Sequence, residues 1–120
     1  MQFAIIPHES AQDFARRTDP DAAGPDWAGW VAYSGTLVQA GVFVRGAGLD
    51  LPTSAAILRH GPAGRIVQDG PFAEVKEQLG GFFIIGVPDL DTALSRAGRA
   101  PIPAHGAVEV PPVLPPPPAP

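Results

Sequence analysis

The chain has 120 residues, which fits one domain with a single hydrophobic core. It carries eight Lys and Arg against twelve Asp and Glu, a net charge of -4, so nucleic acid is excluded as the main partner. The absence of cysteine excludes disulfides, thiolate nucleophiles and Cys-based zinc sites. No signal-peptide pattern and no apolar run of about 18 residues is present, which predicts a soluble cytoplasmic protein without a membrane partner.

The first half of the chain predicts one short strand and one long helix. An apolar strand spans 2–6 and is expected to end at Pro7, and the polar stretch 9–26 is expected to be a loop with one turn of helix near "AQDFARR". A helix then begins near Pro25 and ends before Gly41. Helical spacing predicts that its buried face consists of Trp27, Trp30, Val31, Ser34, Leu37 and Val38.

The second half predicts five strands and one more helix. Residues 42–46 form a strand, and 54–69 form an antiparallel hairpin that turns at "GPAG". The continuous apolar run 80–87 predicts a strand buried on both faces. A helix follows, starting at Pro88–Asp89 and ending at Gly98 with Leu90, Ala93, Leu94 and Ala97 on one face, and 106–110 is the last strand.

This alternation of strands and helices predicts an α+β ferredoxin-like sandwich of the dimeric α+β barrel type, an antiparallel sheet with two helices on one face. We expect a second copy of the chain to cover the other face, giving a homodimer. The folded domain is expected over 1–113. The proline-rich end 114–120 is interpreted as a flexible tail in preference to a polyproline II ligand.

Histidine and aspartate are the candidate chemical groups. His8, His60 and His105 lack the spacing of a helical zinc motif, so no metal is predicted, and an exposed loop position is the default interpretation of each. His8 is the best placed because it directly follows the first strand. Asp69 stands before Gly-Pro, where its carboxylate either stabilises a turn or helix start or faces a pocket. Serine-nucleophile, phosphate-loop and dinucleotide motifs are absent.

The segment "DGPFAEVKEQLGGFFIIGVPDLDTAL" (69–94) resembles the DGPF branch of the YCII-related (YciI-like) family, as do "AGVFVRGAGLDLP" (40–52) and "GAVEVPPV" (106–113). The resemblance implies a ferredoxin-like fold that dimerises through its sheets. It also implies a His–Asp site in a cleft, which falls on Asp69 and, more loosely, on His8. Val75, Pro111 and Ser95–Arg96 depart from the family's usual Thr or Ser, Arg, and Glu-Trp.

Two functions follow from these observations. In the first, His8 and Asp69 form an acid–base pair without a cofactor, acting as a lyase or isomerase on a small, ring-containing substrate. Phe72, Glu74 and Lys76 would contribute to binding, although a solvated face is the default interpretation of Glu74, Lys76 and Glu77. Phe72, Phe82, Phe83, Trp27 and Trp30 are either core residues or an apolar wall. In the second, the protein is a non-catalytic ligand-binding or regulatory accessory protein, of the kind that the resemblance links to extracytoplasmic-function sigma factors.

Overall fold

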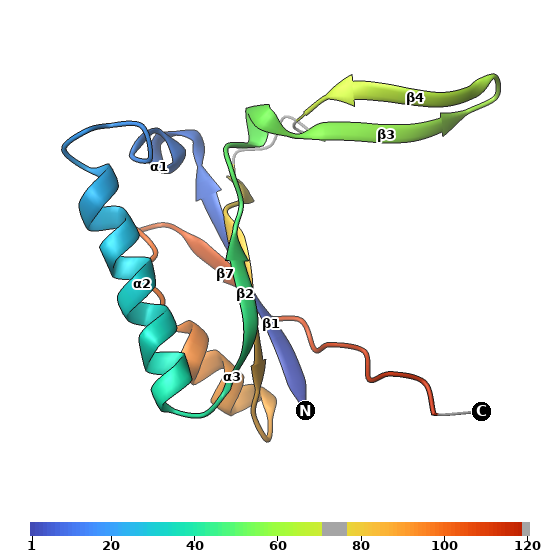
Figure 1. Ribbon diagram of the computed structural model, residues 1–120. Coiled ribbons are helices and arrows are strands. Elements are labelled where there is room, and N and C mark those ends of the chain that lie inside the picture. The colour runs from blue at the N-terminus through green and yellow to red at the C-terminus, as the bar shows by residue number, and fades with distance from the viewer. Residues whose placement is uncertain (71–76, 119–120) are drawn as a thin grey trace.

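The central element of the structure is the first strand, which pairs along both of its edges. The computed structural model describes residues 1–70 and 77–118 (Figure 1). Its elements are β1 (Gln2–Ser10), α1 (Ala11–Ala15), α2 (Ala23–Gln39), β2 (Phe43–Gly48), the 3-10 turn η1 (Pro52–Ser54), β3 (Ala56–Gly61), β4 (Gly64–Asp69), β5 (Glu77–Leu79), β6 (Gly81–Gly86), α3 (Leu90–Ala97) and β7 (Ala107–Glu109).

The main sheet is antiparallel and runs β2-β6-β1, with β5 and β7 also paired to β1. Figure 1 shows α2 and α3 together on one face of this sheet. The fold is therefore the predicted α+β ferredoxin-like sandwich.

The core lies between this face of the sheet and the two helices. Ile5, Leu37 and Ile85 are its largest fully buried side chains. Tyr33 is also buried, and its hydroxyl donates to the Arg96 carbonyl at 2.8 Å, which joins α2 to α3. Asp89 caps the first turn of α3 by accepting from the Thr92 backbone N–H, so the predicted helix start is confirmed.

The predicted buried faces of the helices are partly wrong. On α2, Leu37 is buried as predicted, but Trp27, Val31 and Val38 are 67 %, 53 % and 58 % exposed. The contact with the sheet is instead made through Tyr33 and Leu37, one turn apart, with Trp30 packed beside them. On α3, Ala93 and Ala97 of the expected apolar face are buried, whereas Leu90 and Leu94 remain about half exposed.

Pro7 does not end the first strand, contrary to prediction. β1 continues to Ser10 because its pairing changes at this point: residues 2–5 face β6, and residues 8–10 face β5. Pro7 still accepts a hydrogen bond, 3.0 Å from the backbone N–H of Gly80. Proline removes a donor and keeps its carbonyl, so it is tolerated where regular pairing is already interrupted. The helical turn predicted within 9–26 is confirmed as α1.

The predicted hairpin over 54–69 is confirmed, but it is not part of the main sheet. β3 and β4 pair only with each other among the described strands, and Figure 1 shows them extending away from the sandwich. The turn needs Gly64, whose φ of 121° is a conformation that other residues rarely adopt.

The chain after β7 runs back along the edge of β1. Ala4 N–H donates to the Pro111 carbonyl at 2.9 Å, and Val113 N–H donates to the Gln2 carbonyl at 2.8 Å. The division into a domain over 1–113 and a tail over 114–120 stays a prediction. Among the described helices, none has the length and apolar character needed to cross a bilayer.

Candidate functional site

The alternation of side chains along β1 places the carboxylate of Glu9 on the buried side of the sheet. Phe3, Ile5, Pro7 and Glu9 share the helix-facing side of β1, because alternate residues of a strand point to the same face. The first two belong to the apolar core. Glu9 lies beyond it and is only 4 % exposed, which makes it the one charged residue buried among those that the structure describes.

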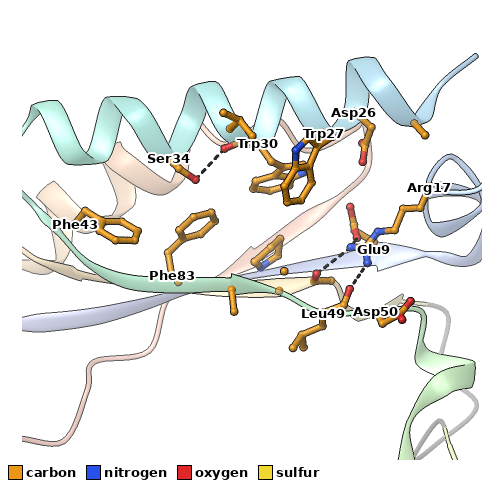
Figure 2. A pocket seen from close by; sticks show the side chains of 18 residues that line it. Glu9, Arg17, Asp26, Trp27, Trp30, Ser34, Phe43, Leu49, Asp50 and Phe83 are labelled. Carbon is orange, nitrogen blue, oxygen red and sulfur yellow. Dashed lines mark hydrogen bonds and ion pairs between the residues drawn. The ribbon is translucent and has the colours of Figure 1, made fainter.

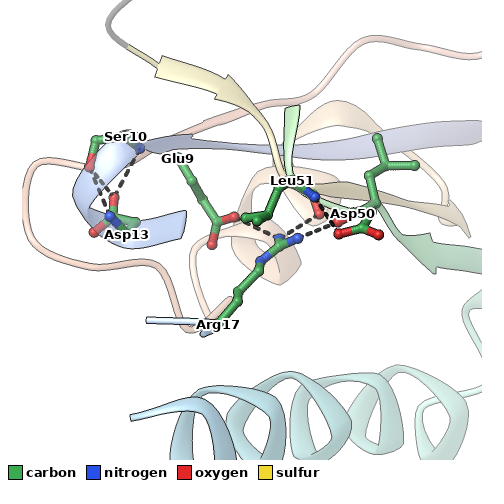
Figure 3. A network of polar contacts seen from close by, with 8 residues as sticks. Glu9, Ser10, Asp13, Arg17, Asp50 and Leu51 are labelled. Atoms are coloured by element: carbon green, nitrogen blue, oxygen red, sulfur yellow. Dashed lines mark hydrogen bonds and ion pairs between the residues drawn. The ribbon is translucent and has the colours of Figure 1, made fainter. Parts of the chain in front are cut away.

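An arginine just after α1 pairs with this carboxylate. Ser10 and Asp13 cap α1 reciprocally, which turns the chain tightly after β1 and brings Arg17 back toward Glu9 (Figure 3). The Nη2 atom of Arg17 donates to Glu9 Oε2 and to the Gly80 carbonyl, both at 2.9 Å. Its Nη1 atom donates to the Leu49 carbonyl. We call these three contacts the Arg17 clamp.

A bulge in the sheet makes room for the clamp. The register of β1 changes by one residue between the pairs Ile5–Phe83 and His8–Leu79, so residues 6 and 7 lie opposite the three residues 80–82. A Cβ atom at Gly80 would overlap Oε2 of Glu9 and lie 2.8 Å from its Cδ. The glycine therefore provides the space that the buried carboxylate occupies.

The clamp lies at one end of a pocket of about 670 Å³ between α2 and the sheet (Figure 2). Its walls are largely apolar and include Trp27, Trp30, Phe43 and Phe83, and its polar groups include Glu9, Arg17, Asp26, Ser34 and Asp50. Trp30 stacks on Phe83 with ring centroids 6.0 Å apart and planes 20° apart, so part of the aromatic wall is fixed. A volume of this size suits a small organic molecule.

Burial raises the pKa of the Glu9 carboxyl above its ordinary value. The positive charge of Arg17 and its hydrogen bond oppose this rise, whereas the negative charge of Asp26 adds to it. Only Oε2 of Glu9 is bonded to another described residue. Oε1 has no hydrogen-bond partner among the described residues, and Glu9 lines the pocket. The site thus offers a largely buried carboxyl with one unbonded oxygen and a raised pKa.

The structure separates the predicted pair of site residues. His8 points to the opposite face of β1 from Glu9, and its Nε2 lies 3.0 Å from Glu109 Oε1 on β7. Asp69 is exposed at the end of β4, opposite Ala56 in the hairpin. Among the described residues, no hydrogen bond or ion pair joins the two, so their partnership stays a prediction. Phe72, Glu74 and Lys76 lie outside the described residues.

The sequence pattern does not indicate Glu9 and Arg17 as site residues, because it predicts a loop over 9–26. Extending the alternation of Phe3 and Ile5 by four residues would have placed Glu9 on the inner face, but Pro7 argued against that extension. The apolar wall was predicted beside His8 and Asp69, whereas Trp27, Trp30 and Phe83 line the pocket beside Glu9, and Trp30 and Phe83 also pack against the core.

Comparison with known proteins gives two findings. A family model described as the YCII-related domain matches residues 1–116. An uncharacterized protein of Rhizobium meliloti (strain 1021) is 52 % identical over 60 residues, which covers 50 % of this chain and 48 % of that protein. The aligned part therefore spans about half the length of that relative. The resemblance of residues 69–94 to the DGPF branch stays a prediction.

Proposed function

Because this chain belongs to the YCII-related domain family, in which we expected acid–base chemistry on small molecules, we propose that the pocket under α2 binds a small organic molecule and that Glu9 exchanges a proton with it. The observation that carries the proposal is a carboxyl only 4 % exposed that opens into a pocket of about 670 Å³. Charged side chains are rarely buried without a reason, and functional sites are a common one.

The chemistry follows from the balance of charges on Glu9. Burial favours the neutral acid and Arg17 favours the carboxylate, and the net effect raises the pKa of Glu9, which strengthens the carboxylate as a base. Oε2 is held by the clamp, so Oε1, which has no bonded partner among the described residues, is the oxygen that would exchange the proton. Removal of a proton from a carbon atom next to a carbonyl and its return at another position would give the isomerase activity expected from the sequence. The same proton removal followed by departure of a leaving group from the neighbouring carbon, with its bonding electron pair, would give the lyase activity.

The test is hydrogen exchange in a panel of small ring ketones and lactones. The full chain is incubated with each compound in D₂O, and deuterium uptake is followed by mass spectrometry. We expect uptake by at least one class of compound, reduced by roughly 10²-fold or more in Glu9→Gln and retained in the control Asp21→Asn. Uptake that persists in Glu9→Gln would refute the assignment of Glu9.

The same assay compares the Glu9 site with the His8–Asp69 site predicted from the sequence. We propose His8 with Asp69 as a second location for this chemistry, since an imidazole beside a carboxylate is an effective base near neutral pH. This pair requires Asp69 to approach His8 and replace its contact with Glu109. Loss of exchange in both His8→Ala and Asp69→Asn, with Glu9→Gln still active, would favour that location.

A binding function without turnover is the second candidate. The Arg17 clamp supports it, because a carboxylate that holds an arginine between three segments already has a structural use. In that case compounds protect the fold against heat and exchange no proton. A regulatory role beside a sigma factor would belong to this candidate.

We also propose that a second copy of the chain covers the sheet face that carries His8 and Glu109, since α2 and α3 cover the other face (Figure 1). Light scattering during gel filtration should give twice the 12.4 kDa of one chain, and a monomeric mass would contradict the homodimer.

A further inference from the structure

The charges around the pocket indicate which ligands it accepts. Three of the described residues that line it carry carboxylates, Glu9, Asp26 and Asp50, whereas one, Arg17, carries a positive charge. With all of them ionised, the lining has an excess of two negative charges. From this arrangement we infer that the pocket takes an organic cation, a primary to quaternary amine on an apolar or aromatic body. The inference rests on the proposed small-molecule function of the pocket.

The single arginine does not supply a free anion site. Its donors bond Glu9, Gly80 and Leu49, so an anion could bind it only by displacing these contacts. Displacement of the Glu9 carboxylate would leave a buried charge without a partner, which is strongly unfavourable. An anionic ligand would also face the remaining carboxylates. Arg17 is therefore already paired within the protein and does not attract an anionic ligand.

Asp26 is the carboxylate that remains available. Figure 2 shows it on α2 above Arg17 and Glu9, and no described residue forms a hydrogen bond or ion pair with its side chain. Its negative charge is felt at Glu9, where it raises the pKa of that carboxyl. A bound cation would relieve the repulsion between the two groups. The second acceptor is Glu9 itself, whose Oε1 has no bonded partner among the described residues and whose side chain is more than nine-tenths buried.

The aromatic wall suits a cation as well. Trp27 directly follows Asp26 and lines the pocket while remaining 67 % exposed, so the face of its indole is not consumed by core packing. A cation over an indole face gains about 0.5–1 kcal/mol at an exposed site. Trp30 and Phe83, which are stacked together, provide the surface for an apolar body. A charged head near Asp26 and a ring against this wall would use both kinds of lining.

The inference is tested with three probes that share one ring: benzylammonium, benzyl alcohol and phenylacetate. The chain has two tryptophans, and both line the pocket, so quenching of their fluorescence reports binding there. We expect the cation to bind roughly tenfold more tightly than the alcohol, and the anion to bind more weakly than the alcohol. The preference should fall to about twofold or less in Asp26→Asn, and the matched control Asp21→Asn should keep it.

The outcomes separate the two proposals. Saturable binding of the alcohol and the cation with equal affinity would overturn the cation inference and leave the small-molecule pocket intact. A preference for the cation that is unchanged in Asp26→Asn would also overturn the inference. If none of the three probes saturates, the cation inference fails, and the deuterium-exchange assay decides separately whether the proposed function holds. Thermal unfolding of each variant checks that the fold is retained.

Discussion

Replacing Gly80 with alanine tests the geometry of the Arg17 clamp directly. The nearest atoms to the new Cβ would be Oε2 and Cδ of Glu9 and, at 3.2 Å, Nη2 of Arg17. These are side-chain atoms, so the backbone need not move, but the Glu9 carboxylate has to leave its arginine. The cost is then one hydrogen bond between charged groups in a mostly buried position, about 2 kcal/mol. For a chain of this length that corresponds to a decrease in Tm of roughly 7 °C.

Urea unfolding followed by circular dichroism measures this loss, and two further glycines calibrate it. Gly35 lies inside α2 with open space around its Cα, so Gly35→Ala should stabilise the chain by about 0.5–1 kcal/mol. Gly81→Ala should cost more than Gly80→Ala, because its Cβ would lie 2.8 Å from the backbone carbonyl of Ala47, which cannot rotate away. These controls separate the clamp from general effects of alanine.

A double variant isolates the role of Glu9. In a Glu9→Ala background the space beside residue 80 is vacant, so adding Gly80→Ala should cost under about 0.5 kcal/mol, and the two changes should be strongly non-additive. Equal costs in both backgrounds would refute the argument that the glycine exists to accommodate the carboxylate. An unchanged stability of the single Gly80→Ala variant would refute it as well.

Three further predictions concern titrating groups. The folded state raises the pKa of Glu9 above 4.5, so the stability of the wild type should fall as pH rises from 4.5 toward neutrality. Urea unfolding at a series of pH values should show this decline in the wild type and not in Glu9→Gln. Burial raises the pKa of Tyr33 to about 12, so ultraviolet titration of this single tyrosine should show ionisation near 12, and stability should fall between pH 10 and 12. Tyr33→Phe removes the hydroxyl's hydrogen bond to the Arg96 carbonyl, which keeps its bond from the Arg99 N–H, and should cost about 1 kcal/mol. Side-chain and backbone hydrogen bonds from Thr92 lower the pKa of Asp89 below 3.8, so Asp89→Ala should destabilise α3 above that pH. The difference in stability from wild type should vanish as acid protonates the Asp89 carboxylate. A difference that stays constant with pH in thermal unfolding would contradict this prediction.

The parts of the fold that the sequence predicts are those with local signals. Asp89 and Gly98 mark the ends of α3, and the Gly-Pro-Ala-Gly turn marks the hairpin of β3 and β4, because capping and turn geometry depend on a few neighbouring residues. The order of elements then leads to the sandwich.

The site depends on tertiary contacts and was therefore not predictable in the same way. Pro7 has a strong local preference to end a strand, and that preference is overridden by the bulge near Gly80, which lies far along the chain. Likewise, the helical pattern of α2 includes Trp27 and Val31 in the apolar face, but the space beneath them is a pocket and not a packed sheet. Periodicity indicates which residues share a face and does not reveal whether that face meets a neighbour.

The contacts of Arg17 also determine when the pocket can exist during folding. Its partners lie 8, 32 and 63 positions away along the chain, at Glu9, Leu49 and Gly80. Closing loops of the two longer lengths costs entropy before any contact forms, so the contacts with Leu49 and Gly80 form only after the strands next to these residues have come together. A nascent chain that ends before Gly80 therefore has no site, and ligand binding becomes possible only after β6 has been synthesised and paired. Substitutions in the clamp should accordingly accelerate unfolding and leave the folding rate almost unchanged.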